Sequence, residues 1–189
     1  MPTAGATYTL HNRADRRVRH HCARTWLLLN NELTDFNFAP LTPGVPDPNL
    51  PAPGKRPRSS MSPTIVLRNE RPMIAVGSPG GVTIVTTVLQ TLVNRLDLGM
   101  TLPESIAAPR ISQRNRSATE AEPAFLNSPE RAALERLGQQ FVLAPQTFTP
   151  SPEIGAVAAL EFQCDGTVTA VAEPERRGGG SAMVVHEKR

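Results

Sequence analysis

Three polar clusters are the parts of this sequence whose residue types could do chemistry. The first is Ser59-Ser60-Met61-Ser62-Pro63, which has three hydroxyls in five residues and directly precedes an expected strand. Hydroxyls and nearby backbone amides can hold a carboxylate through charge-assisted hydrogen bonds. A polar turn before a strand would have the same composition, and on these residues alone it is the commoner explanation.

The second cluster is Gly77-Ser78-Pro79-Gly80-Gly81, which stands directly before an apolar segment of helical period. Consecutive glycines let backbone N–H groups approach a ligand closely, and a helix N-terminus adds partial positive charge. This arrangement suits an oxyanion hole, in which amides point at developing negative charge. An ordinary tight turn between a strand and a helix fits the same residues.

The third cluster is Asn30–Phe36, in which the carboxylates of Glu32 and Asp35 are three residues apart among amides. Paired acids can bind an ammonium group through complementary charge, although solvated surface acids are the blander alternative. His20-His21-Cys22 has adjacent side chains that point to opposite sides of an extended chain, with no fourth ligand at a useful spacing. We therefore expect neither a metal nor another cofactor.

The elements that must position these clusters follow from apolar periodicity and turn residues. Residues 63–67 and 73–76 are expected to form a hairpin, and Val85, Leu89, Leu92 and Leu96 to form the buried face of a helix. Further expected elements are a strand at 5–10, helices at 103–108 and 129–137, and strands at 142–143, 154–162 and 167–171. Strand hairpins followed by helices, with strands returning at the end, predict an α+β sandwich.

We expect a single domain over residues 1–189, with three irregular stretches. Residues 37–58 are a proline-rich loop, because proline removes backbone donors and fixes φ. Residues 112–123 are polar and irregular, and residues 174–189 form a Gly-rich tail that we expect to be flexible.

The bulk composition excludes some classes of protein. With 39% hydrophobic and 20% charged residues, the 189-residue chain is typical of a globular domain. A formal charge of +3 is too small to indicate nucleic acid, and no apolar run is long enough to span a membrane. The N-terminus lacks the apolar core of a signal peptide, and Cys22 and Cys164 do not suggest a disulfide framework.

Taken in order along the chain, the three clusters and the short blocks around them form a pattern that is specific for one protein family. The series is Tyr8-Thr9-Leu10, Leu28–Phe36, Pro43–Pro46, Gly54–Val66, Gly77–Gly81 and Thr86–Gln90. This order and spacing resemble the small subunit of γ-glutamyltransferases, also called γ-glutamyltranspeptidases or glutathione hydrolases. The resemblance is close over most of residues 7–110 and looser beyond them. Its most specific parts are the Ser-Ser-Met-Ser-Pro-Thr and Gly-Ser-Pro-Gly-Gly blocks.

The resemblance implies an N-terminal-nucleophile hydrolase, whose αββα sandwich is made by two subunits cut from one precursor; this chain would be the small-subunit half only. In such enzymes a threonine freed by self-cleavage attacks the γ-glutamyl amide of a substrate such as glutathione. The acyl group then passes to water or to an amino acid or peptide. By position, Gly80 and Gly81 would form the oxyanion hole, and the hydroxyl of Thr9 would support the nucleophile.

The same resemblance implies how the glutamyl head group is bound. By position, Ser59 and Ser60 would hold the substrate α-carboxylate. Glu32 and Asp35 would hold its α-ammonium. Each of these roles agrees with the chemistry that the residue types suggest by themselves.

The sequence also departs from the family pattern. The family's nucleophile lies in a Thr-Thr-His-type block well before the Tyr-Thr-Leu strand, where this chain has only residues 1–6. Residues 11–26 are rich in Arg, His and Cys where the family has a glycine-rich stretch, and a local frameshift is our hypothesis for them. Family members are usually exported, whereas the N-terminus of this sequence lacks the apolar core of a signal peptide. The location of the chain therefore stays open.

These departures leave three interpretations. The chain is an enzyme part that acts with a large subunit, or a non-catalytic remnant that keeps a glutamyl-binding pocket. The third interpretation is a basic protein that binds an acidic partner through Arg13–Arg24. We expect the 189-residue chain by itself to be inactive and poorly folded, because strands that pair with a large subunit would be exposed edges.

Overall fold

The computed structural model describes residues 32–146 and 151–183. They belong to two compact units, a smaller one that ends at Ser60 and a larger one that begins at Met61, and we describe each by itself. The expected strand at 5–10, including Thr9, and the unusual segment 11–26 lie outside the described residues.

The larger unit is built on a four-stranded antiparallel sheet with the strand order β1-β2-β6-β7. These strands are β1 (Thr64–Arg68), β2 (Arg71–Gly77), β6 (Ala158–Phe162) and β7 (Val168–Ala172). Asn69 and Glu70 both have positive φ, which closes the β1–β2 hairpin tightly. The predicted hairpins are confirmed, although β6 begins at Ala158, later than expected.

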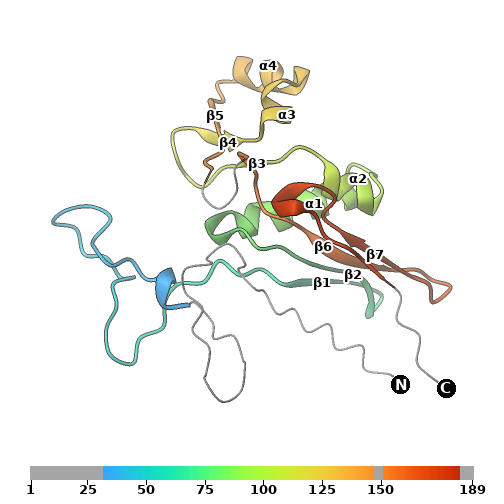
Figure 1. Cartoon of the computed structure of the whole chain (residues 1–189), viewed down its shortest axis with the longest axis horizontal. Helices are drawn as coiled ribbons and strands as arrows, with labels where there is room; N and C mark the ends of the chain where they lie inside the picture. The colour runs from blue at the N-terminus through green and yellow to red at the C-terminus, as the bar shows by residue number, and fades with distance from the viewer. Residues whose placement is uncertain (1–31, 147–150, 184–189) are drawn as a thin grey trace. The chain divides into compact units, whose positions relative to one another are not determined.

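Two helices cover one face of this sheet (Figure 1). The 3-10 turn η2 (Gly81–Thr83) leads into α1 (Ile84–Leu96), and α2 (Leu102–Ala107) follows. A capping box between Thr101 and Glu104 begins α2. The core lies between these helices and the sheet, and its buried members are Ile74, Val76, Ile84, Val88, Leu102, Ile106, Val157 and Ala159.

The face that α1 buries differs from the prediction. Thr87 and Thr91 are buried beside Val88, whereas Val85 is 50% exposed and Leu89 is 59% exposed. Each buried threonine hydroxyl donates to a backbone carbonyl one turn earlier, so neither is left without a partner. The apolar period therefore identified the helix correctly, but of the four residues on the predicted face only Leu92 packs against the core.

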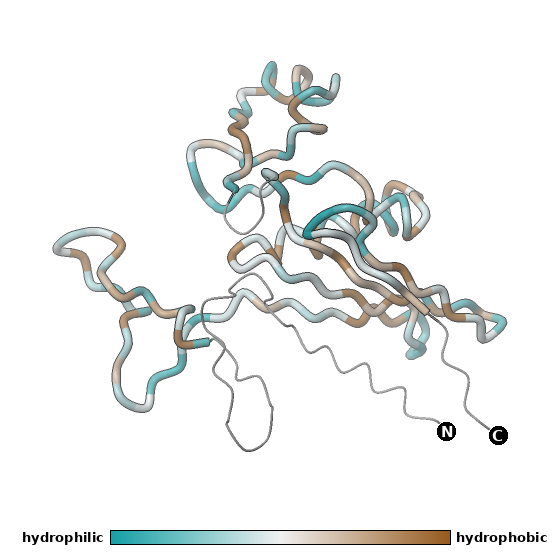
Figure 2. Tube along the Cα trace, viewed as in Figure 1, coloured by the Kyte–Doolittle hydropathy of each residue, from teal (hydrophilic) through white to brown (hydrophobic). Residues whose placement is uncertain are grey.

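The opposite face of the sheet carries a continuous apolar row. The register places Ile65 beside Ala75, Ala75 beside Leu160, and Leu160 beside Ala170. Ile65 is 66% exposed, and Figure 2 shows that apolar residues recur along these strands. A sheet with apolar residues on both faces is the inner layer of a sandwich, because each apolar face gains stability by being covered.

A small second sheet accompanies the first. It has the order β3-β4-β5, with β3 (Ile111–Ser112), β4 (Thr119–Ala121) and β5 (Phe141–Leu143). The helices α3 (Pro123–Leu126) and α4 (Pro129–Arg136) connect β4 to β5, and Ser128 is the N-cap of α4 as predicted. The expectation that residues 112–123 are irregular is wrong in part, because β4 pairs in parallel with β5.

The smaller unit contains one 3-10 helix, η1 (Glu32–Asp35), within its described residues. Residues 36–60 have no helix or strand, as the prolines predict. Side chains organise this loop instead, and Asp47 and Asn49 are its main hydrogen-bonding residues. A last 3-10 turn, η3 (Arg176–Gly178), belongs to the larger unit.

Candidate active site

The turn at Gly80 and Gly81 joins the end of β2 to the start of the η2–α1 helical segment. Gly80 has φ 155° and Gly81 has φ 56°, and L side chains rarely adopt either conformation. A Cβ at Gly80 would lie 2.7 Å from the hydroxyl of Thr83, whereas a Cβ at Gly81 would meet nothing within 4 Å. Both residues are therefore glycine for backbone reasons, and Gly81 faces open space at the positive end of a helix.

A third glycine, Gly155, packs against the residues that support this turn. Gly155 has φ 68°, and a Cβ there would lie 2.7 Å from the Thr87 side chain and 2.8 Å from the Ser78 hydroxyl. The Ser78 hydroxyl donates to the Pro79 carbonyl at 2.7 Å and accepts from the Ala156 N–H at 3.0 Å. Ser78 is 2% exposed, so this junction fixes the backbone immediately before Gly80.

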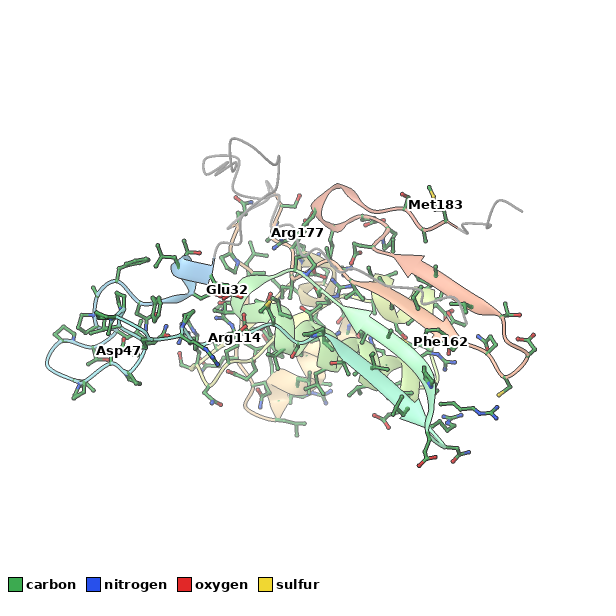
Figure 3. The ribbon with its side chains drawn as sticks, turned by 90° about the horizontal axis from the view of Figure 1, so that it is seen from below. Glu32, Asp47, Arg114, Phe162, Arg177 and Met183 are labelled. Atoms are coloured by element: carbon green, nitrogen blue, oxygen red, sulfur yellow. The ribbon has the colours of Figure 1, made fainter. Side chains whose placement is uncertain are left out.

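A cavity of about 250 Å³ opens beside the glycine turn. Its charged wall consists of Arg114, Glu120, Glu153 and Arg177, all of which belong to the larger unit. Figure 3 labels Arg114, from the β3–β4 connection, and Arg177, from η3.

The charged side chains of the cavity wall interact in pairs. Arg114 donates to Glu120 at 2.5 Å, and Arg114 Nε and Glu120 Oε2 are buried without a hydrogen-bond partner among the described residues. The backbone N–H of Arg177 donates to Glu153 at 2.8 Å. Burial lowers the pKa of the Arg177 guanidinium, and the Glu153 carboxylate opposes this effect. The wall thus has two cations and two anions and no net charge.

A buried network of two arginines and two glutamates holds the cavity wall in place. Glu122 accepts from the Ile154 N–H at 2.8 Å and from the Arg176 guanidinium at 2.6 Å. Arg110 donates to the Ile154 carbonyl at 2.8 Å and to Glu173 at 2.9 Å. Because Ile154 lines the cavity and precedes Gly155, this network fixes the segment that supports the glycine turn.

Within this network, burial lowers the pKa of each arginine, whereas the neighbouring carboxylates raise it. Burial, with the neighbouring Arg176 charge, lowers the pKa of Arg110, and Glu173 opposes the shift. Burial by itself would also lower the pKa of Arg176, but hydrogen bonds and charge from Glu122 and Glu173 outweigh it and raise that pKa. The charge of each buried arginine therefore depends on the carboxylates beside it.

In the smaller unit, an acid pair (Glu32 and Asp35) precedes the loop of residues 36–60, and a serine pair (Ser59 and Ser60) ends it. Glu32 begins η1 and Asp35 ends it. Burial, and then repulsion by Glu32, raise the pKa of the Asp35 carboxyl, whereas the positive charge of Arg58 opposes that rise. Ser59 and Ser60 directly follow Arg58 in the chain.

Neither a metal centre nor a membrane span emerges from the described ranges. Within residues 32–146 and 151–183, no three His, Cys, Asp or Glu side chains are grouped as metal ligands. Every helix in those ranges is too short or too polar to cross a bilayer. His20-His21-Cys22 lies outside them.

Sequence reasoning missed the charged residues of the larger unit. Arg110 is 1% exposed and Arg176 is 8% exposed, although both types are usually found at the surface. Several of their partners lie far away in the chain, at separations of up to 70 residues that no local spacing marks. Arg176 also falls in the tail that was expected to be flexible; its flexibility stays a prediction.

Comparison with known proteins places the chain in a family. The family model described as gamma-glutamyltranspeptidase matches residues 19–183. The chain belongs to the γ-glutamyltranspeptidase family. The glutathione hydrolase proenzyme of Bacillus subtilis is 35% identical over 163 residues, which are 86% of this chain and 26% of that protein. The Escherichia coli proenzyme is 47% identical over 89 residues, which are 44% of this chain and 15% of that protein.

Solved members of the γ-glutamyltranspeptidase family have the same fold. A Helicobacter pylori γ-glutamyltranspeptidase mutant matches with a TM-score of 0.70 and 32% identity, over 89% of this chain and 90% of that chain. The fold is therefore α+β of the N-terminal-nucleophile hydrolase type, as predicted. The chain spans about a quarter of the length of the Bacillus subtilis proenzyme, at 26%.

Proposed function

We propose that this chain is the small-subunit portion of an enzyme that transfers or hydrolyses γ-glutamyl groups, with glutathione as the representative substrate. The observation that carries the proposal is the turn at Gly80 and Gly81. It combines two backbone conformations that favour glycine, a helix N-terminus and an adjoining cavity. An acyl transfer needs donors of this kind, because negative charge develops on the carbonyl oxygen as the nucleophile adds.

In the proposed mechanism, a threonine hydroxyl attacks the γ-glutamyl carbonyl carbon. The electron pair of the C=O bond moves onto the oxygen, and the amides of Gly80 and Gly81 stabilise it there. The tetrahedral intermediate then expels the amine, which takes the proton that the hydroxyl gave up, and leaves a γ-glutamyl ester on the threonine. Water or an amine attacks this ester in the second step and regenerates the hydroxyl. Thr9 would support the nucleophile, by family resemblance alone.

The head group of the substrate would be bound by the smaller unit. Glu32 and Asp35 would hold the α-ammonium, and Ser59 and Ser60 the α-carboxylate. The raised pKa of Asp35 supports this assignment, because it comes from burial and from repulsion by Glu32. An ammonium group placed between the two acids would relieve that repulsion and favour ionised Asp35.

A large-subunit partner is the second part of the proposal. The chain covers 26% of the Bacillus subtilis proenzyme but 90% of the matching Helicobacter pylori crystal chain, as expected if such precursors are cut into parts of this size. The outward row of Ile65, Ala75, Leu160 and Ala170 and the exposed Leu89 of α1 are apolar surfaces that a second subunit could cover.

A graft tests the proposed activity. Residues 19–183, the range that the family model matches, replace the corresponding segment of the Bacillus subtilis proenzyme, which supplies the nucleophile and the rest of the sandwich. We call this protein the graft enzyme. It should release p-nitroaniline from γ-glutamyl-p-nitroanilide. Gly81→Ala should lower kcat about 100-fold or more, because it disturbs one oxyanion donor.

Gly138→Ala is the matched control for Gly81→Ala. Gly138 also has a positive φ, 89°, and an added methyl group there would meet nothing within 4 Å, but it follows α4 outside the cavity lining. It shares the conformational cost of Gly81→Ala and should leave kcat within about twofold. Equal losses in the two variants, or a graft enzyme with no turnover, would reject the proposal.

The alternative is a non-catalytic protein that keeps a glutamyl-binding pocket. Its specific support is the segment of residues 11–26, which is rich in Arg, His and Cys where the family has a glycine-rich stretch. This alternative predicts that the graft enzyme binds L-glutamate without cleaving the anilide. Calorimetry measures the binding, and the chromophore assay measures the cleavage.

A further inference from the structure

One side chain joins the two ends of the proline-rich loop in the smaller unit. Asn49 Nδ2 donates to the Asp35 carbonyl at 2.7 Å, and Asn49 Oδ1 accepts from the Arg58 N–H at 2.8 Å. Asp35 is the last residue of η1, and Arg58 is the residue before Ser59. The Asn49 amide therefore connects the acid pair directly to the segment that carries the serine pair.

Asn49 is itself held on its backbone. Its N–H donates to Asp47 Oδ1 at 2.8 Å, and its carbonyl accepts from the Asn37 N–H at 3.0 Å. The other carboxylate oxygen of Asp47 accepts from Asn37 Nδ2 at 2.8 Å. The hydrogen bond from the Asn49 N–H, followed by that from Asn37, lowers the pKa of Asp47, so Asp47 accepts as a carboxylate at neutral pH.

The composition of the loop explains why a side chain has to make this connection. Residues 37–58 contain seven prolines (Pro40, Pro43, Pro46, Pro48, Pro51, Pro53 and Pro57), none of which has a backbone N–H to donate. Asn49 is only 8% exposed, so water competes little for its amide. A buried amide with both a donor and an acceptor bond made has one preferred orientation.

We propose that Asn49 is a positioning residue for the glutamyl head group: it sets the separation between the ammonium-binding acids and the carboxylate-binding serines. This inference rests on the proposed function, because it takes those residues as the binding groups. The side chain has the required length and chemistry. Aspartate offers no N–H to the Asp35 carbonyl, and glutamine is longer by one methylene.

The test compares two donors in the graft enzyme: γ-glutamyl-p-nitroanilide and glutaryl-p-nitroanilide, which lacks only the α-ammonium. The selectivity is the ratio of kcat/KM for the two donors. Asn49→Ala should raise KM for the γ-glutamyl donor about tenfold and reduce the selectivity about tenfold, with a smaller change in kcat. A loss of folded protein alone would lower the rates of both donors equally and leave the selectivity unchanged.

Two further variants separate the bridge from general loosening of the loop. Asn49→Asp keeps the shape and the acceptor for the Arg58 N–H but sets a carboxylate against the Asp35 carbonyl, so its selectivity should fall at least as far. Asn37→Ala removes a bond to Asp47 but keeps both bridging bonds, so its selectivity should fall less than threefold. If Asn49→Ala does not fold, the isosteric Asn49→Asp carries the comparison.

Each possible result either supports or contradicts the positioning role of Asn49. Retained selectivity in the folded Asn49 variants, or an equal loss in Asn37→Ala, would overturn the positioning role while leaving the proposed function intact. An unsubstituted graft enzyme that cleaves neither donor, or cleaves both equally well, would overturn the proposed function and this inference with it. A tenfold loss confined to the Asn49 variants is the expected result.

Discussion

Replacing Gly155 by alanine should damage the support behind the glycine turn. Two costs add at this position. A left-handed conformation costs an L residue about 1–2 kcal/mol. The new methyl group would also lie 2.7 Å from Thr87 Cγ2 and 2.8 Å from the Ser78 hydroxyl, and overpacking of this kind costs about 1–3 kcal/mol. The total is about 2–5 kcal/mol, a large part of the ~5–15 kcal/mol that stabilises a typical protein.

Gly166→Ala isolates the backbone cost. Gly166 has φ 87° in the exposed β6–β7 turn, and a methyl group there would meet nothing within 4 Å. It should therefore cost only the ~1–2 kcal/mol of the left-handed conformation. The remaining difference of about 1–3 kcal/mol comes from the contacts of Gly155. This difference should appear as a lower Tm for Gly155→Ala than for Gly166→Ala.

The assay is thermal denaturation of the two alanine variants in the graft enzyme, together with kcat for the γ-glutamyl anilide. Gly155→Ala should have the lower Tm. It should also have the lower kcat, because the two backbones are close: a Cβ at Gly80 would lie 3.5 Å from the Gly155 Cα. Small displacements of catalytic donors are costly. Equal Tm and kcat values in the two variants would refute the claim that Gly155 supports the turn.

Three further predictions concern charge and surface. Glu173→Gln should destabilise the graft enzyme by about 3–5 kcal/mol in urea denaturation, because it leaves the buried charge of Arg110 without its partner, whereas the exposed Glu135→Gln should cost less than about 1 kcal/mol. L-glutamine binding to a graft enzyme without its nucleophile should weaken as pH falls through the raised pKa of Asp35, since only the carboxylate attracts the ammonium; calorimetry should find this pH dependence reduced in Asp35→Asn. Ile65→Ser should reduce aggregation of the isolated chain and weaken its co-purification with a large-subunit portion, and unchanged co-purification would count against the outer face as the partner surface.

The local elements were predictable from the sequence because their signals are local. The β1–β2 hairpin has alternating apolar residues around a polar turn, and Ser128-Pro129-Glu130 is a helix start in composition alone. The face of α1 was not predictable in this way. The helix has apolar residues on both sides, so period alone could not show that Thr87 is buried and Leu89 exposed.

Features that depend on distant pairing could not be predicted. The strand β4 has three residues and is recognisable only because it pairs with β5, about twenty residues later. The side-chain partners of Arg110 come from α2, the segment before β6 and the residue after β7. The candidate site residues were found because they lie in short blocks that resemble the family, whereas Asn49 stands among prolines and has no motif.

The most direct measurement is a crystal structure of the graft enzyme with L-glutamate bound. The account predicts that the α-ammonium contacts Glu32 and Asp35, the α-carboxylate contacts Ser59 and Ser60, and the γ-carboxylate lies within hydrogen-bond distance of the Gly80–Gly81 amides. Glutamate bound to one of these clusters while the other two face elsewhere would contradict the account.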